Sequence, residues 1–216
     1  MKQVYIIWND GWHPQKDIEP AVSEIFKGDD WETVKTERAR DLLEPGVSPD
    51  LAIFYTNGRP AGETDLTNEE QKKIADKVEA GMGILFIHAG LTIIEPDSVF
   101  YQELNSGRFV SHPPKCDVTM TPVAGLNHPI LEGIAPFTNF DEHYYCPMFP
   151  DRTQVLMCAS SENSVTAGMW CHSFGKGRVA SITQGHTLEM QTDPEMVKLV
   201  RNAACWLTGQ EKGDTV

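Results

Sequence analysis

Short apolar runs and helical patterns alternate along the first half of the chain. Val4–Trp8 and Leu51–Tyr55 are apolar runs of the length expected for buried strands. Glu32–Glu37 places one valine among charged or polar neighbours, as a half-exposed strand does. Ile18–Phe26 carries apolar residues at helical spacing and ends before Gly28. These segments predict successive βα units.

A second helix is predicted before the most apolar strand of this half. Thr67 and Glu70 form a capping box, and apolar residues on one face continue to Gly81. The strand Ile84–Ile87 follows, and His88 comes directly after it. Strands that alternate with helices at this spacing imply right-handed crossovers and a mainly parallel sheet with helices on both faces.

The second half has a different pattern, in which strands follow one another without helices between them. They are predicted at Cys116–Thr121, Val155–Ala159, Val165–Ser173 and Arg178–Thr183. The turn "FGKG" joins the last two as a hairpin, so antiparallel strands extend one edge of the sheet. A closing helix is expected from Met196 to Leu207, and no linker divides residues 1–216, which we interpret as one domain.

Composition and charge narrow the function classes. The chain has 216 residues, 40% hydrophobic and 23% charged, as ordinary globular proteins have. No run of 18 apolar residues occurs, and Asn9 and Asp10 interrupt the first apolar run, so we expect no membrane span, no signal peptide and a cytoplasmic location. The net charge of −13 would repel a phosphate backbone, which predicts no nucleic-acid partner.

Several common chemistries are missing from the sequence. The five cysteines are widely spaced with no C-x-x-C pair, and we expect reduced thiols that pack in the interior. No G-x-S-x-G, P-loop or G-x-G-x-x-G motif is present, so the usual loops for serine hydrolysis or a nucleotide cofactor are excluded.

Histidines follow several of the predicted strands. His13, His88 and His186 come at or just beyond strand ends, where loops meet above the carboxyl edge of an α/β sheet. A histidine such as His88 can also simply bond a nearby carbonyl. His112 lies in a less regular stretch that can fold over the same crevice, whereas His128 and His172 are interpreted as structural, the first as a turn cap and the second as solvent-facing.

Glu142 is the candidate carboxylate of this site. If its stretch is extended, Asp141 and Glu142 point to opposite faces, and only one of them can face a site. Glu142 shares parity with Phe140 and Tyr144, which suggests the apolar side, where a carboxylate needs a partner. A histidine or metal can supply that partner, and so can backbone amides around a purely structural glutamate.

Five ordered segments resemble the trehalose-utilisation, or ThuA-like, family over nearly the whole chain. They are "VEAGMGILFIHAG", "FYQELNSGRFVSHPP", "NHPILEGI", "FDEHYY" and "FGKGRVASITQGHT". Met82 and Ser106 stand where the family often has glycine. The resemblance implies a three-layer, flavodoxin-like fold of the class I glutamine-amidotransferase group. The amidotransferase relatives carry a nucleophilic cysteine at the strand-to-helix elbow, but this chain has His88 there, so it is not expected to hydrolyse glutamine.

The resemblance also implies a role in carbohydrate catabolism. We expect a hydrolase or lyase that acts on a disaccharide or keto-sugar, with His88, Glu142 and His186 in catalysis. His13, His112, Trp12 and Tyr144 are the substrate-binding candidates, although aromatic residues at such positions also pack in cores. The same His88, His186, Glu142 and His13 can hold zinc or another divalent transition metal, or form a metal-free proton relay. A non-catalytic sugar- or effector-binding protein is the alternative, and a homo-oligomer is possible for either.

Overall fold

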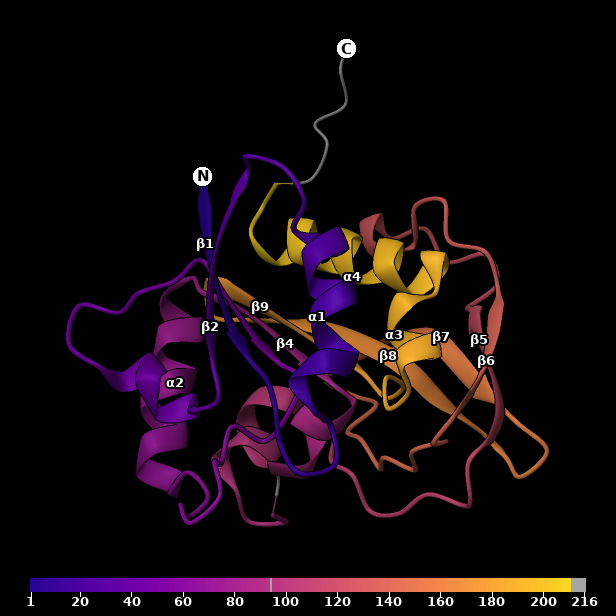
Figure 1. The fold of residues 1–216 in the computed structure, drawn as a ribbon, viewed down its shortest axis with the longest axis horizontal. Helices are drawn as coiled ribbons and strands as arrows, with labels where there is room; N and C mark the ends of the chain where they lie inside the picture. The colour runs from indigo at the N-terminus through magenta and orange to yellow at the C-terminus, as the bar shows by residue number, and fades with distance from the viewer. Residues whose placement is uncertain (94, 211–216) are drawn as a thin grey trace.

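Nine strands form one sheet in the order β2-β1-β3-β4-β9-β8-β7-β5-β6 within residues 1–93 and 95–210, the residues that the computed structural model describes (Figure 1). The strands are β1 (Lys2–Ile7), β2 (Trp31–Thr36), β3 (Leu51–Phe54), β4 (Gly83–Ile87), β5 (Cys116–Pro122), β6 (Phe137–Asp141), β7 (Gln154–Ser160), β8 (Val165–Phe174) and β9 (Gly177–Ile182). The α-helices are α1 (Gln15–Ile25), α2 (Asn68–Ala80), α3 (Leu188–Thr192) and α4 (Pro194–Leu207). Short 3-10 segments lie at Ala39–Leu43, His88–Ile93 and Pro129–Leu131, and a π-helical turn at Phe100–Asn105.

Helices cover both faces of the sheet, and the strands supply apolar side chains to each face in turn. Leu85 and Ile87 of β4 belong to the core that packs against α1, α3 and α4. Ile84 and Phe86 belong to the core on the other face, with α2. Figure 1 shows α2 on the opposite side of the sheet from α1 and α4. This alternation is why a continuous apolar run forms a strand buried on both faces.

The sheet is mixed rather than mainly parallel, which corrects the expectation from sequence. Strands β2, β1, β3, β4 and β9 pair in parallel, whereas β8, β7, β5 and β6 extend the sheet by antiparallel pairing. The "FGKG" turn explains the change of direction, because Phe174 pairs with Gly177 and so short a connection permits only antiparallel strands. The antiparallel part is thus nearly half of the sheet and not a small extension.

The predicted elements agree with the structure in most places. The capping box of α2 is formed in both directions between Thr67 and Glu70, and the apolar strand β4 lies in the middle of the sheet, as expected. β6 was not predicted, because only Phe137 and Asp141 of its five residues are buried and the pattern lacks an apolar alternation. Among the helices of the described residues, none has the length and apolarity that a membrane crossing needs.

Candidate functional site

Four of the predicted site residues meet at the carboxyl edge of the parallel strands. His13 lies in the loop after β1, His88 directly follows β4, and His186 lies in the loop after β9. Glu142 follows the last residue of β6 and reaches the same place from the antiparallel half of the sheet. The structure therefore brings together residues that are far apart in the sequence, at the edge where α/β folds bind ligands.

His88 occupies a sharp turn between β4 and the next 3-10 segment. Its backbone has φ 47°, the left-handed conformation expected for a strand-to-helix elbow and costly for a residue with a side chain. A Cβ at Gly90 would lie 2.2 Å from the Phe54 carbonyl oxygen, so the turn also needs glycine two residues later. Nδ1 of the His88 ring donates to the Thr183 carbonyl at 2.9 Å. Nε2 is buried and makes no hydrogen bond within the described residues.

His13 is oriented by Asp10. The backbone N–H groups of Trp12 and His13 both donate to Asp10 Oδ1 at 2.7 Å, and His13 Nδ1 lies 3.0 Å from the same oxygen. Burial raises the pKa of Asp10, but the hydrogen bond and charge of His13 outweigh it and leave that pKa below its usual value. Because Nδ1 faces the Asp10 carboxylate, Nδ1 carries the proton of the neutral tautomer, in which the Nε2 lone pair points toward the cluster.

His186 is held through its backbone by a carboxylate that the sequence interpretation had placed away from the site. Asp141 is fully buried and accepts the N–H groups of Gly185 at 2.8 Å, His186 at 2.9 Å and Thr187 at 3.1 Å. Asp141 therefore shapes the loop that presents the His186 ring. The parity argument was wrong in part, because Phe140 is 56% exposed rather than inward-facing.

Glu142 lies at the centre of the imidazoles. Its Oε2 is 3.3 Å from His186 Nδ1, 3.4 Å from His88 Nε2 and 3.6 Å from His112 Nε2. Burial raises the pKa of Glu142, but the His88, His186 and His112 rings outweigh it and bring that pKa to about 2. Burial lowers the pKa of His186 to about 4, against the opposing effect of the Glu142 carboxylate. At neutral pH the site thus holds an ionised carboxylate beside a neutral His186 ring.

The three inner histidines form a set that fits a transition metal. Their ring nitrogens all lie within 4.8 Å of one another, and His13 Nε2 is 3.1 Å from His186 Nδ1. Zn–N bonds of about 2.0–2.1 Å at tetrahedral angles place neighbouring ligand atoms about 3.3 Å apart. The His13–His186 spacing is close to that value. The outer nitrogens of His13 and His88 bond a carboxylate and a backbone carbonyl, the usual partners of metal-bound imidazoles.

The other predicted substrate-binding residues, Tyr144, His112 and Trp12, lie around the imidazole cluster at different depths. Tyr144 is buried and its ring lies 3.8 Å from that of His88, centroid to centroid, so it packs beneath the elbow rather than forming a free wall. His112 stands at the rim, where its ring stacks on Tyr144. Trp12 is 81% exposed and borders a pocket beside the cluster.

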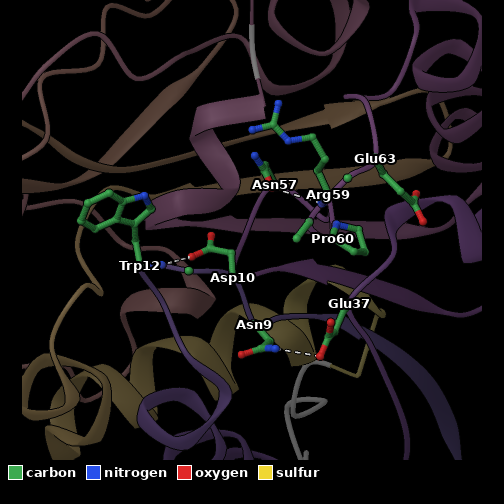
Figure 2. Close-up of a pocket in the computed structure, with 11 residues that line it drawn as sticks. Asn9, Asp10, Trp12, Glu37, Asn57, Arg59, Pro60 and Glu63 are labelled. Carbon is green, nitrogen blue, oxygen red and sulfur yellow. Dashed lines mark hydrogen bonds between the residues drawn. The ribbon is translucent and has the colours of Figure 1, made fainter.

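That pocket has a volume of about 590 Å³ and lies over the ends of β1, β2 and β3 (Figure 2). Asp10 and Trp12 form one wall, and the facing residues come from Glu37 and from the segment 57–63, which includes Asn57 and Arg59. The sequence analysis did not identify Glu37, Asn57 or Arg59. They follow strands β2 and β3 as His13 follows β1. Their position just after a parallel strand was the one feature of the sequence that could have identified them as site residues.

Two further histidines make hydrogen bonds of their own rather than joining the cluster. His128 Nδ1 accepts the Ile130 N–H and caps a short helical turn, as expected. His172 does not merely face solvent, because its Nε2 bonds the Leu104 carbonyl at 2.7 Å. None of the five cysteines forms a disulfide within the described residues, and burial raises the pKa of Cys171 to about 12. His88, not a thiol, occupies the elbow, so the chain lacks the cysteine through which glutamine amidotransferases react.

Comparisons with known proteins place the chain in a family. The model of the ThuA family, described as trehalose utilisation, matches residues 3–207. The chain belongs to the ThuA family. This assignment confirms the resemblance found in the sequence motifs. Among proteins with curated descriptions, none matches the chain.

Solved structures of ThuA-like proteins share the fold. A putative ThuA-like protein from Bacteroides uniformis superposes with a TM-score of 0.70 at 19% identity, covering 98% of this chain and 93% of that one. One from Parabacteroides merdae gives 0.69 at 16% identity, covering 100% and 92%. A structure described as a cytoplasmic protein from Salmonella typhimurium LT2 gives 0.61 at 13% identity, covering 97% and 98%. At these identities the similarity establishes the fold alone.

Proposed function

We propose that this ThuA-family chain is an enzyme of carbohydrate catabolism that cleaves a disaccharide or keto-sugar derivative by hydrolysis or lyase-type elimination. The observation that carries the proposal is the orientation of two imidazoles toward one point. Asp10 and the Thr183 carbonyl fix the protons of His13 and His88 on Nδ1, which leaves both Nε2 lone pairs directed inward. A protein that only binds a neutral sugar has no need for imidazole lone pairs directed at one point.

The chain's own donors fit a divalent transition metal. His13, His88 and His186 supply three imidazole nitrogens, and His88 Nε2 is buried and makes no hydrogen bond within the described residues. Three protein ligands with a further position open is the arrangement of catalytic zinc. A bound metal would supply a Lewis acid that polarises a substrate oxygen and lowers the pKa of a bound water.

Glu142 is the acid–base group in this proposal. Its carboxylate is ionised at neutral pH and lies within 3.4 Å of His88 and His186, so it can accept a proton from water or from the substrate. After bond cleavage the same carboxyl can return that proton to the leaving oxygen. His112 at the rim donates its Nδ1–H to the Pro113 carbonyl, so its Nε2 can accept a hydrogen bond from a substrate hydroxyl beside Glu142.

A metal-free relay is the second candidate for the same residues. The 3.1 Å separation of His13 Nε2 and His186 Nδ1 is also a hydrogen-bond distance. In that arrangement Asp10, His13 and His186 form a chain that ends at Glu142, and His88 acts as general base. The family description supports a sugar substrate in either case.

The direct test is an activity assay with purified protein against trehalose, other disaccharides and their 3-keto derivatives. We expect cleavage by wild-type protein, at least a hundredfold loss in Glu142→Gln, and little change in Glu132→Gln, an exposed glutamate outside the site. Binding of a sugar without cleavage under any metal condition would favour the binding-protein alternative and reject the enzymatic proposal.

A further inference from the structure

The pocket beside the histidine cluster is built from loops that follow three neighbouring parallel strands. Asn9, Asp10 and Trp12 come from the loop after β1, Glu37 follows β2, and the segment 57–63 follows β3 (Figure 2). Its volume of about 590 Å³ lies within the roughly 300–1,000 Å³ typical of small-molecule sites. The pocket is therefore large enough for a ligand of its own next to the imidazoles.

Asp10 joins this pocket to the cluster. The carboxylate lines the pocket and also lies 3.0 Å from His13 Nδ1. The neighbouring Asn9 has φ 67°, and its Oδ1 accepts the Gln15 N–H at 2.8 Å. A ligand that fills the pocket would thus lie against Trp12, the neighbour of His13 in the chain. The loop that carries Asp10 and His13 is held in a fixed conformation by its own hydrogen bonds.

Trp12 presents an exposed aromatic face on this fixed loop. The indole is 81% exposed, whereas most large apolar side chains of a folded protein are buried. Its backbone N–H donates to Asp10 Oδ1 at 2.7 Å, so the position of the residue is set (Figure 2). An apolar ring beside amide and carboxylate groups matches a ligand that has a C–H face and a rim of hydroxyls, which is the chemistry of a pyranose ring.

The charges of the pocket select against anions. Asp10, Glu37 and Glu63 line it, together with the guanidinium of Arg59. Glu63 is paired with Arg38 at 2.6 Å, which leaves the carboxylates of Asp10 and Glu37. Arg59 also pairs with Asp65 at 3.0 Å, so its charge is already compensated. A phosphorylated sugar would meet excess negative charge here, whereas the hydroxyls of a neutral sugar can donate to the carboxylates and accept from Asn57.

We propose that this pocket binds the second, uncharged sugar ring of a disaccharide substrate, with the bond to the first ring lying over the histidine cluster. The proposal rests on the proposed function and adds to it the subsite that holds the second ring and the preference of that subsite for an uncharged ring. Trp12 stacks on the second ring, and Asn57, Glu37 and Asp10 bind its hydroxyls.

Binding is tested by calorimetric titration of trehalose, glucose and trehalose 6-phosphate into the His88→Ala protein, which should not consume the disaccharide. We expect trehalose to bind more tightly than glucose or the phosphate. In the His88→Ala protein, the second substitution Trp12→Ala should raise the Kd for trehalose about tenfold, which corresponds to ~1.4 kcal/mol. Val165→Ala removes another exposed apolar side chain, in β8, and is the control with unchanged affinity. Equal affinity of the Trp12→Ala and control proteins, or preference for the phosphate, would reject the subsite.

Kinetics separate this subsite from the proposed function. With a disaccharide and the matching methyl glycoside as substrates, Trp12→Ala should reduce kcat/KM at least tenfold more for the disaccharide. Equal losses with the two substrates would reject the subsite while leaving the enzyme proposal intact. Trehalose binding that depends on Trp12, without cleavage of any sugar, would support the subsite and reject the enzymatic function.

Discussion

The Asp141 carboxylate accepts the backbone N–H of His186 at 2.9 Å, and through it a buried residue of β6 sets the loop that carries a candidate metal ligand. The same carboxylate accepts the N–H groups on either side, at Gly185 and Thr187. Burial raises the pKa of Asp141, although the backbone donors and the nearby His88 oppose that effect. Asp141 acts on His186 through the backbone and is therefore a positioning residue.

Substitution Asp141→Asn should misplace His186. An amide offers one acceptor oxygen instead of two, so at least one buried N–H loses its partner, at a cost of ~1–3 kcal/mol in the free energy of unfolding. We expect a lower Tm and a larger loss of activity than stability alone explains. The exposed Asp117 of β5 supplies the control Asp117→Asn. Equal stability and activity of the two variants would show that the Asp141 contacts do not position the loop.

The elbow should not tolerate a side chain at Gly90. An added Cβ would lie 2.2 Å from the Phe54 carbonyl and 3.0 Å from the Phe54 Cβ, so either β3 or the His88 turn must move. We expect Gly90→Ala to lower the free energy of unfolding by ~1–3 kcal/mol in urea titrations and to reduce activity. Gly11→Ala is the matched stability control, because its Cβ would meet nothing within 4 Å. A Gly90→Ala protein as stable as this control would contradict the close packing described here.

The sequence was sufficient to predict β4 and the elbow, because a run of apolar residues ending in His88 and Gly90 is determined by local burial and backbone geometry. The parallel strands then placed His13, His88 and His186 at one edge. The role of Asp141 could not be predicted, because its three bonds reach across more than forty residues of sequence and no local pattern marks them. The extent of the antiparallel part was misjudged because β6 was not predicted, and because the long connections β5–β6 and β6–β7 carry no local signal for strand direction.

Glu70 should stabilise the fold only above acidic pH. The hydrogen bond from Arg40 lowers the pKa of Glu70 from its usual 4.5 to about 2, and Arg40 Nε lies 2.7 Å from Glu70 Oε1. A carboxyl whose pKa is depressed on folding contributes stability above its unfolded pKa and loses it as pH falls from about 4.5 toward 2.

The variant Glu70→Gln isolates this charge, because glutamine can still complete the capping box of α2. We expect it to lose ~1 kcal/mol in the free energy of unfolding at pH 7, and the difference from wild type to shrink as pH falls below 4.5. Glu69→Gln removes an exposed carboxylate that pairs with Lys73 and should have no measurable effect. A difference between Glu70→Gln and wild type that is the same at pH 7 and pH 3 would contradict the ion-pair assignment.

The metal content of the purified protein, measured together with its activity before and after chelation, tests the central claim most directly. The account predicts about one divalent transition metal ion per chain. His88→Ala and His13→Ala should lose the metal and the activity, and the remote control His172→Ala should keep both. Chelated wild-type protein should be inactive and should recover when zinc or another divalent transition metal is restored. Full activity of wild-type protein after verified metal removal would contradict the metal site and leave His88 as the general base of a metal-free relay.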